Sequence, residues 1–374
     1  MRAVIVGAGI GGLAAAVALR RIGIETVNLE RVGEIGEVGA GLSIWSNAVN
    51  ALRALGVGDK VVARASVVER IPSHTLSGRF IGVTDLSEIS RAAGAPCVCV
   101  HRAVLQRVLL EELPAGSVRT GVRCVGFDGS NAVLDGGARV EGDLLVGADG
   151  IRSTIREGLH GAAAPRYAGY TCLRGICGDS GALKDKSALL AVGSGMQVGV
   201  WPCGAGQLYW FLTKNAPAGT KQRKDDVLAL CRPWGLIHKI VAGTAEEAIV
   251  QSDIFDRPPL KCWGRGRVTL AGDAAHATTP NLGQGACQAL EDAVVLADCV
   301  RRLQPVEAAL GEYEKRRIPR TTMIVRNSWE SGRTLQIDRP ALEALRNWFM
   351  GSRMGKHFSA RTFQKLLTYR VPKL

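Results

Sequence analysis

The sequence predicts an α/β fold in which a parallel-sheet domain covered by helices is interrupted by a β-rich lobe and followed by C-terminal helices. Three observations predict this fold. A strand–helix–strand pattern opens the chain of 374 residues, short apolar runs separated by Gly, Pro and Asn fill the middle, and a strand–loop–helix pattern returns near residue 267. This order favours an interrupted domain over two domains that follow one another.

Composition agrees with a folded enzyme-sized protein. Hydrophobic residues make up 47% and charged residues 22%, which excludes intrinsic disorder, collagen and coiled coil as descriptions of the whole chain. No run of about 18 apolar residues without charge occurs, so no transmembrane segment is expected. A strand begins at Ala3, where a signal peptide would need its basic and apolar regions, and the ten cysteines include no Cys-x-x-Cys. These features predict a cytoplasmic protein.

A metal site is not expected. Cys97, Cys99 and His101 alternate on a predicted strand, which suggests zinc ligands at first sight. In an extended strand, however, Cys97 and His101 lie about 13 Å apart, which is too far for one tetrahedral ion.

The opening unit carries a glycine-rich turn between a strand at 3–6 and a helix from about residue 11 to 22. In the run Gly7-Ala8-Gly9-Ile10-Gly11-Gly12, Gly7 permits the tight turn, Gly9 lets a pyrophosphate approach the backbone, and Gly12 allows close helix–strand packing. The free N–H groups of the helix N-terminus then face the phosphate.

Glu30 ends the second strand, at 24–30, where a carboxylate can bond a ribose diol. Together with the glycines it predicts a dinucleotide site without separating NAD from FAD. Farther along, Asp143–Ser153 contains another buried strand, which ends in the turn Asp149-Gly150 before a helix.

The third strand–loop–helix unit favours a flavin. A strand at 267–271 runs into Gly272-Asp273, where the carboxylate can hold a second sugar hydroxyl, and a loop leads to a helix at about 284–303. The helix N-terminus at Gly283–Ala286 would stabilise the negative charge of a reduced flavin. An ordinary Gly-rich turn explains the glycines but not this order. A further helix over 305–318 is expected to end at Pro319.

Together the three motifs resemble the class A flavoprotein monooxygenases, of which para-hydroxybenzoate hydroxylase is the best-known member, from residue 1 to about residue 320. Gly7–Gly12 matches the dinucleotide fingerprint, Asp149-Gly150 the Asp-Gly motif and Gly272-Asp273 the Gly-Asp motif. Details resemble the branch that includes salicylate hydroxylase, zeaxanthin epoxidase and FAD-dependent urate hydroxylase. They are Gly39–Ser43 with Asn47, His101–Gln106 and Tyr167–Thr171.

The resemblance implies a discontinuous, glutathione-reductase-type FAD-binding domain at 1–70, 97–165 and 258–330. It places a substrate-binding β lobe at 71–96 and 166–257, and a basic helical segment at 331–374. FAD is the implied bound cofactor. Arg102 is one of its implied ligands, and the alternative for this residue is that of a surface arginine at the start of a helix. The resemblance places Glu30 and Arg31 at the adenosine ribose, Ser43 and Arg102 near the pyrophosphate and ribityl chain, and the backbone of Cys124 at the adenine. The other implied FAD-binding residues are Gly7, Gly9, Gly11, Gly12, Asp149, Asp273, Leu282, Gly283, Gln284, Gly285 and Ala286.

The implied reaction is oxygen insertion. NADH or NADPH reduces FAD, O₂ adds at flavin C4a to give a hydroperoxide, and one oxygen atom passes to a small aromatic, heteroaromatic or unsaturated substrate. No second glycine fingerprint follows a strand, which agrees with transient nicotinamide binding. Two alternatives remain: an oxidase or reductase on the same scaffold without oxygen insertion, and a non-catalytic basic flavoprotein.

Candidate substrate residues lie on the expected strands 197–201 and 207–212. The resemblance places the substrate pocket between the flavin and the β lobe. The residues that would line or flank it are Gln197, Val198, Trp201, Tyr209 and Phe211, and core packing is the alternative for each apolar member. The resemblance places Pro280 beside the flavin edge, although a proline there can also simply end a strand. Gln197 replaces the arginine that urate hydroxylases use, which favours a less charged substrate. His276 is a candidate acid or base, but a packing role is favoured.

The chain is basic, with a net charge of +13. Residues 341–374 contain seven Lys and Arg against one Glu, and a solvated helical face is the favoured interpretation. No nucleic-acid motif accompanies the charge, so no nucleic-acid partner is expected. A peripheral membrane contact through this segment is left open, as is the choice between monomer and homodimer.

Overall fold

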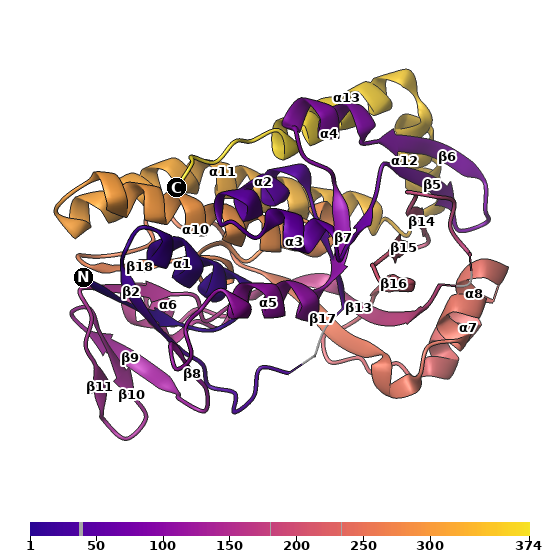
Figure 1. The fold of residues 1–374 in the computed structure, drawn as a ribbon. Coiled ribbons are helices and arrows are strands. Elements are labelled where there is room, and N and C mark those ends of the chain that lie inside the picture. Colours follow the sequence, from indigo (N-terminus) through magenta and orange to yellow (C-terminus); the bar gives the residue numbers. More distant parts are fainter. Residues whose placement is uncertain (37–39, 180, 233) are drawn as a thin grey trace.

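The computed structural model describes residues 1–374 except 37–39, 180 and 233 (Figure 1). Its first layer is a five-stranded parallel sheet in the order β18-β12-β1-β2-β8. Strands β1 and β12 are short, nearly continuous apolar runs, as is typical of strands covered on both faces of a sheet. The strands of this sheet are β1 (Arg2–Val6), β2 (Glu25–Leu29), β8 (Val118–Arg119), β12 (Leu144–Gly147) and β18 (Val268–Leu270).

Helix α1 (Ile10–Arg21) packs against α10 (Gly285–Arg302), and a three-stranded antiparallel sheet packs against β1 and β12. A second small sheet, in the order β3-β7-β4, lies next to α10. The strands of these two sheets are β9 (Cys124–Asp128), β10 (Asn131–Leu134), β11 (Arg139–Val140), β3 (Gly41–Ile44), β4 (Ser66–Val67) and β7 (Val98–His101).

The largest sheet has seven strands in the order β17-β13-β16-β15-β14-β5-β6. All its pairs are antiparallel except β14 and β5, and β5 and β6 join it from a distant part of the sequence. The expected antiparallel strands at 197–201 and 207–212 are confirmed. The strands are β5 (Arg70–Thr75), β6 (Phe80–Asp85), β13 (Arg166–Gly178), β14 (Leu189–Gly193), β15 (Met196–Pro202), β16 (Gln207–Asn215) and β17 (Val250–Asp256).

The two faces of this sheet have different partners. Leu208, Trp210 and Leu212 of β16 pack with α7 and α8 in a separate apolar core, whereas the alternate residues face away from those helices. The remaining shorter helices are α2 (Ser46–Ala54), α3 (Gly58–Val62), α4 (Ser87–Ala93), α5 (Arg102–Glu111), α6 (Thr154–His160), α7 (Lys224–Cys231), α8 (Gly235–Ala242) and α9 (Asp273–His276).

The helix expected over 305–318 does not end at Pro319. Helix α11 runs from Val306 to Leu335 with Pro319 inside it, so that prediction was wrong. A proline removes one backbone hydrogen bond and crowds the preceding turn. Here Arg317 and Arg320, on either side of Pro319, are both held by buried ion pairs to Glu291 of α10, and these contacts keep the helix continuous.

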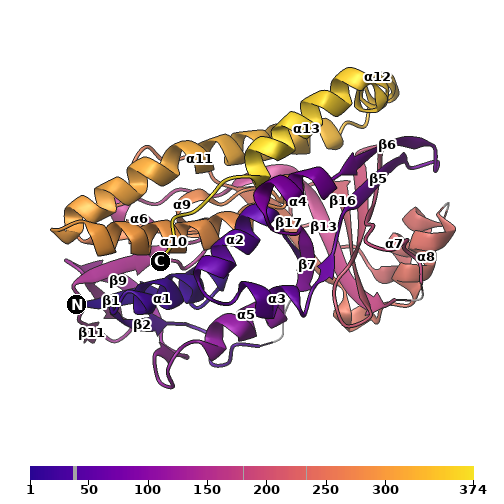
Figure 2. The same ribbon diagram turned by 45° about the horizontal axis from the view of Figure 1, so that its top comes forward.

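Two further helices, α12 (Pro340–Gly351) and α13 (Arg353–Leu367), complete the chain and return it across β6 and α4 (Figures 1 and 2). The expected mixed α/β fold with a parallel Rossmann-like core and separate sheets is confirmed. The domain boundaries remain predictions, and α11 crosses the expected boundary at residue 330 without a break. No helix in the described ranges is long and apolar enough to cross a membrane.

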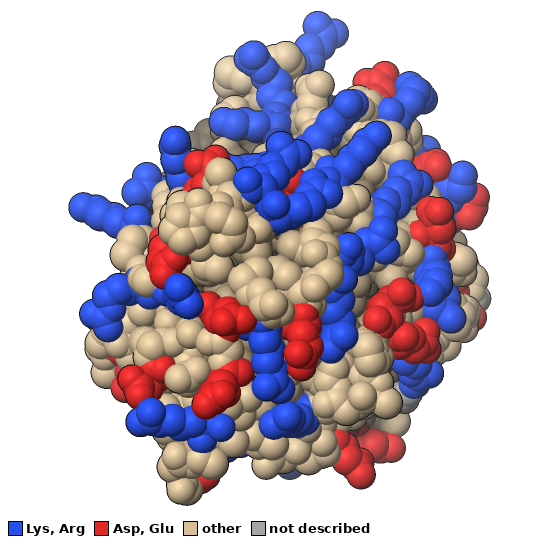
Figure 3. Space-filling view, turned by 60° about the vertical axis from the view of Figure 1, so that its left-hand side comes forward, with Lys and Arg blue, Asp and Glu red and all other residues tan. Residues whose placement is uncertain are grey.

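Charge is unevenly distributed on the surface. Lys and Arg side chains crowd the upper part of the face shown in Figure 3, with Asp and Glu scattered between and below them. This uneven distribution agrees with the net charge of +13.

Candidate functional site

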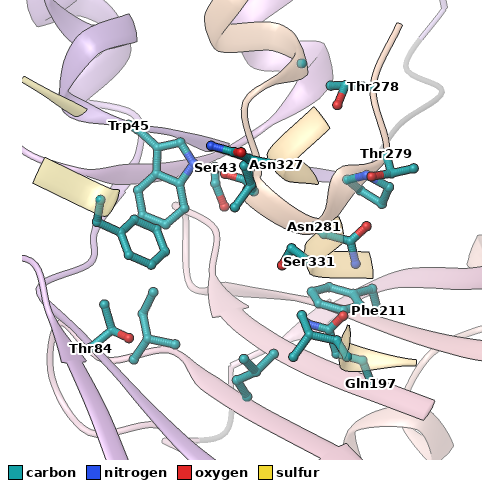
Figure 4. Close-up of a pocket in the computed structure, with 18 of the residues that line it drawn as sticks. Ser43, Trp45, Thr84, Gln197, Phe211, Thr278, Thr279, Asn281, Asn327 and Ser331 are labelled. Carbon is teal, nitrogen blue, oxygen red and sulfur yellow. Dashed lines mark hydrogen bonds between the residues drawn. The ribbon is translucent and has the colours of Figure 1, made fainter. Parts of the chain in front are cut away.

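A cavity of about 1490 Å³ lies where the carboxyl ends of β1, β12 and β18 meet the seven-stranded sheet. Gly9, Gly150 and Asp273, which follow those three strands, line one end of it. Side chains of β15, β16 and β6 line the other end, with Asn327 and Ser331 of α11 reaching in from above (Figure 4). Ligands of parallel α/β sheets bind at such a carboxyl edge.

The glycine-rich turn has the geometry expected from its sequence. Gly7 has a φ of +108°, and a Cβ there would lie 2.4 Å from the carbonyl oxygen of Ala148. A Cβ on Gly12 would lie 2.2 Å from the carbonyl oxygen of Gly7, whereas a Cβ on Gly9 would meet nothing within 4 Å. Gly7 and Gly12 are therefore required by packing, and Gly9 leaves open space in front of the α1 N-terminus. The first N–H groups of α1 have no partner within the helix.

Glu30 lies beside this turn. Its Oε2 accepts a hydrogen bond from Ala8 N at 2.8 Å, and its carbonyl oxygen accepts one from Val122 N at 2.9 Å. The backbone leading to Cys124 is thereby brought next to Glu30. The Cys124 thiol itself points to the Gly126 carbonyl oxygen at 3.2 Å, and Arg31 is exposed.

Asp273 is a free carboxylate at the cavity wall. No residue in the described part of the chain donates a hydrogen bond to its side chain, although Arg102 lines the same cavity. The carboxylate is accessible from the cavity but enclosed by protein on its other sides. This burial raises its pKa, while the charges of His276 and Arg102 oppose the rise. Asp273 is thus positioned to accept hydrogen bonds from a ligand hydroxyl.

The N-terminus of α10 is the second helix end that opens into the cavity. Gly283, Gly285 and Ala286 line the cavity, and Gly283 has a φ of +61°. The indole Nε1 of Trp45 donates to the Leu282 carbonyl oxygen at 3.1 Å and fixes the preceding loop. No side chain caps α10, so its first N–H groups are available to a ligand.

A fully buried ion network holds this helix end in place. Arg317 of α11 donates to Glu291 Oε2 at 2.6 Å and to Asp292 Oδ1 at 2.7 Å. Asp292 Oδ2 in turn accepts from Gly272 N at 2.9 Å and lies 2.6 Å from His276 Nε2. The Gly-Asp motif is therefore tied to α10 and α11 through one carboxylate. The sequence signal was a pair of acids inside an otherwise apolar helix.

The same network predicts a loss of stability at low pH. Burial raises the pKa of Asp292, but the charges of His276 and Arg317 outweigh this effect and lower it to about 2 from an ordinary value of 3.8. The stability gained from this lowered pKa is present above about pH 4 and is lost as the pH falls toward 2. Urea unfolding between pH 5 and pH 2.5 should show a steep decline in the free energy of unfolding. A flat profile would contradict the assignment.

The Asp149 side chain binds the N-terminus of α6, the helix that follows it in the chain. Its Oδ2 accepts from Thr154 N at 2.7 Å at the start of α6, while Oδ1 is buried without a partner. Its neighbours Ala148 and Gly150 line the cavity instead. Arg156 of α6 reaches the Ala274 and Ala275 carbonyl oxygens at 3.0 and 3.1 Å, which couples this motif to the Gly-Asp corner.

The sheet end of the cavity is aromatic and amide-bearing. Gln197, Trp201, Tyr209 and Phe211 line it, as expected, whereas Val198 points to the opposite core. Tyr209 packs directly on β3, because a Cβ on Gly41 would lie 2.5 Å from its ring. Burial raises the pKa of the Tyr209 hydroxyl, which therefore stays protonated.

Sequence reasoning missed Arg174. This side chain lines the same chamber from β13, and its backbone is in register with Phe211 of β16. Nearby Cys172 and Tyr209 favour the charged form and raise the pKa of the arginine. The signal was its spacing of two residues from Cys172, which places both side chains on one face of a strand.

Pro280 borders the cavity at the start of a short 3-10 turn, Pro280–Leu282, and the hydroxyl of Tyr170 donates to Asn281 Oδ1 at 2.7 Å. His276 is buried against Asp292 and does not line the cavity. The predicted residues that line the cavity are Gly9, Gly11, Ser43, Arg102, Gln197, Tyr209, Asp273, Pro280, Leu282, Gly283, Gly285 and Ala286. Those outside its lining are Gly7, Gly12, Glu30, Arg31, Cys124, Asp149 and Gln284.

The donor set fits a dinucleotide with a conjugated ring. Two uncapped helix N-termini suit phosphate and a ring oxygen, Asp273 suits a sugar hydroxyl, and Gly9 leaves room for close approach. Thr278 Oγ1 and Trp201 Nε1 are buried polar atoms without a partner, and both residues line the cavity. The residues present therefore fit bound FAD.

Comparison with known proteins agrees with this geometry. Residues 1–328 match the family described as FAD binding domain. The chain belongs to this family. It is 39% identical over 370 residues to an aurachin C monooxygenase/isomerase from Stigmatella aurantiaca, with 97% of each chain covered. It is 37% identical over 338 residues to an FAD-dependent urate hydroxylase from Klebsiella pneumoniae subsp. pneumoniae, with 87% of this chain and 88% of that protein covered.

A solved structure is also similar over almost the whole chain. HpxO of Klebsiella pneumoniae, complexed with FAD and uric acid, has a TM-score of 0.91 and 32% sequence identity, and the match covers 98% of this chain and 96% of HpxO. The resemblance to the class A flavin monooxygenases is confirmed, as is the prediction of an FAD-dependent oxidoreductase.

Proposed function

We propose that this flavoprotein uses NADH or NADPH and O₂ to insert one oxygen atom into a small aromatic, heteroaromatic or unsaturated molecule. The observation that carries the proposal is the single cavity that joins the FAD-binding groups to the chamber on the seven-stranded sheet. Bound FAD supplies the redox chemistry, since it accepts electrons from the nicotinamide and activates O₂. The protein binds and orients both partners and excludes water from the reacting atoms.

FAD would be held along the carboxyl edge of the parallel sheet. We assign the pyrophosphate to the α1 N-terminus at Gly9 and Gly11 with Arg102, and a ribityl hydroxyl to Asp273. The α10 N-terminus would then hold the ring, and Glu30 would hold the adenosine ribose. The proposed FAD-binding domain comprises 1–70, 97–165 and 258–330, and the proposed substrate lobe comprises 71–96 and 166–257.

The substrate would bind between the flavin and β13, β15 and β16. Gln197 offers a neutral amide, Tyr209 a protonated hydroxyl, and Arg174 a positive charge on the neighbouring strand. This set suits a planar molecule with a hydroxyl or oxo group. An arginine in place of Gln197 would instead suit a substrate that carries a negative charge. The close relative named for aurachin C makes that compound one to screen first, with uric acid as a comparison.

The test is the visible spectrum of the purified protein, with NADPH and NADH added separately under anaerobic conditions. A flavin spectrum that bleaches and returns in air supports electron transfer through this site. Turnover of screened substrates under ¹⁸O₂ should then place one labelled atom in the product. Consumption of NAD(P)H without label in the product would instead favour an oxidase or reductase, and a protein that does not take up FAD would contradict the whole proposal.

Replacement of Tyr209 by Phe is expected to leave FAD binding unchanged and to lower turnover by about tenfold to a hundredfold, because one substrate hydrogen bond is lost. The ring packing on Gly41 stays intact in this variant. Steady-state kinetics and FAD titration of both proteins provide the check. Tyr167→Phe is a matched control, since that hydroxyl bonds the Ala216 carbonyl oxygen and does not line the cavity. If Tyr209→Phe and the parent had equal kinetics, the Tyr209 hydroxyl would have no role with the substrate and the residue would serve packing only.

A further inference from the structure

Exposed apolar side chains concentrate on α12 and α13. Among the described residues, thirteen large hydrophobic side chains are exposed, and six of them lie between residues 342 and 358. Trp348 and Phe358 are each 66% exposed and Leu345 is 59% exposed. A contiguous apolar surface of this kind marks an interaction site in a folded protein. The apolar patch consists of Leu342, Leu345, Trp348, Phe349, Met354 and Phe358.

The two helices are firmly attached through their other faces. In α12, Glu343 accepts a hydrogen bond from Ser194 N at 2.8 Å. In α13, Leu366 and Leu367 are buried, and the Leu366 carbonyl oxygen accepts from Arg320 at 2.9 Å. The Phe363 ring lies 6.1 Å from that of Trp45. The exposed side chains therefore belong to helices that are already packed, and they are available to something outside the chain.

The apolar patch is continuous with the cavity. Five of its six members (all but Met354) also line the cavity, together with Ile81 and Val83 of β6. Figure 4 shows Thr84 of the same strand facing Gln197 and Phe211 across the chamber. An apolar path therefore leads from the outer surface of α12 and α13 to the chamber next to the flavin.

Positive charge accompanies the apolar patch. Arg353, Lys356, Arg361 and Lys365 of α13 are exposed, and no Asp or Glu follows Glu343 in the sequence. Two copies of the chain that met through this face would bring like charges together. An anionic surface satisfies the charges and the apolar side chains at once, and Trp is enriched where proteins meet a bilayer.

We propose that the α12–α13 face docks on an anionic lipid bilayer, with the cavity mouth against the membrane. The aromatic and aliphatic side chains enter the boundary between headgroups and acyl chains, and the four cations of α13 bind the anionic headgroups. An apolar substrate would then pass from the bilayer into the chamber without crossing water. This last clause rests on the proposed function, whereas docking itself does not.

The test is flotation of the FAD-loaded protein with vesicles of phosphatidylcholine alone and of phosphatidylcholine with one third phosphatidylglycerol. Strong binding is expected only to the anionic vesicles, and it should weaken as salt rises. The triple variant Arg353→Gln, Lys356→Gln, Arg361→Gln should bind about 100-fold more weakly, and the double variant Trp348→Ser, Phe358→Ser at least about tenfold more weakly.

Matched variants distinguish the face from general surface effects. Lys221→Gln, Lys261→Gln, Lys315→Gln removes three exposed cations elsewhere, and Leu236→Ser removes an exposed leucine on α8. Both should bind vesicles like the parent. Equal binding of the triple variant and its control would overturn the proposal. So would a dimer in sedimentation velocity that Trp348→Ser, Phe358→Ser dissociates. Vesicle binding that persists in a protein unable to oxidise either NADH or NADPH would count against the proposed function alone.

Discussion

Replacement of Asp273 by Ala is expected to weaken FAD binding by about tenfold to a hundredfold, because a hydrogen bond to a charged group contributes about 1.5–3 kcal/mol. The carboxylate faces the cavity without a hydrogen-bond donor from any residue that the structure describes, so its removal leaves no protein group unpaired. The fold should therefore be retained while the cofactor is lost. Fluorescence titration of the apoprotein with FAD measures the change.

The control for Asp273 is Asp59→Ala, which removes an exposed carboxylate that lies 3.5 Å from Arg53 and does not line the cavity. Thermal unfolding of the apoproteins should be alike in all three proteins. Addition of FAD should raise the melting temperature of the parent and of Asp59→Ala more than that of Asp273→Ala, because at a given ligand concentration a tighter ligand stabilises the folded state more. An unchanged dissociation constant for FAD would refute the assignment.

The cofactor half of the site could be predicted because its requirements are local. Gly7 adopts a φ of +108°, and a Cβ on Gly12 would lie 2.2 Å from a carbonyl oxygen. Each position therefore requires glycine, and that requirement can be recognised at a fixed place in the sequence. The carboxyl ends of parallel strands then bring such positions together at one edge. Asp273 and Gly9 meet there although more than half the chain separates them.

The continuity of α11 and the residues at the substrate end of the cavity depend on contacts between elements that are distant in the sequence. Pro319 predicted a helix end from local rules, but buried ion pairs from α11 to α10 outweigh one missing hydrogen bond. The replacement of an arginine by Gln197 favours a less charged substrate, but the sequence did not indicate that Arg174 brings a guanidinium to the same chamber from β13. The register of β13 against β16 decides which side chains of β13 enter the chamber, and that register is set by pairing across the sheet.

Replacement of Arg317 by Met is expected to lower the free energy of unfolding by about 3–5 kcal/mol, since it leaves two buried carboxylates without their shared cation. Glu291 retains Arg320 at 2.6 Å, but among the residues that the structure describes Asp292 retains only His276 and the N–H of Gly272. The loop before Asp273 is bound to that carboxylate, so FAD affinity should fall as well. Urea unfolding of the apoprotein at pH 7 measures the first effect, and FAD titration measures the second.

Arg316→Met is the matched control because it changes the adjacent residue of the same helix. Arg316 is partly exposed and pairs with the buried carboxylate of Asp298 at 2.9 Å, which Arg301 and Arg302 also bind. Because that carboxylate keeps two partly exposed cations, the loss of Arg316 should lower the free energy of unfolding by no more than about 1 kcal/mol. Arg317→Lys keeps the charge but not the fork of donors, and it should fall between the two. If Arg316→Met and Arg317→Met lowered stability equally, the buried network would not be what holds α11 against α10.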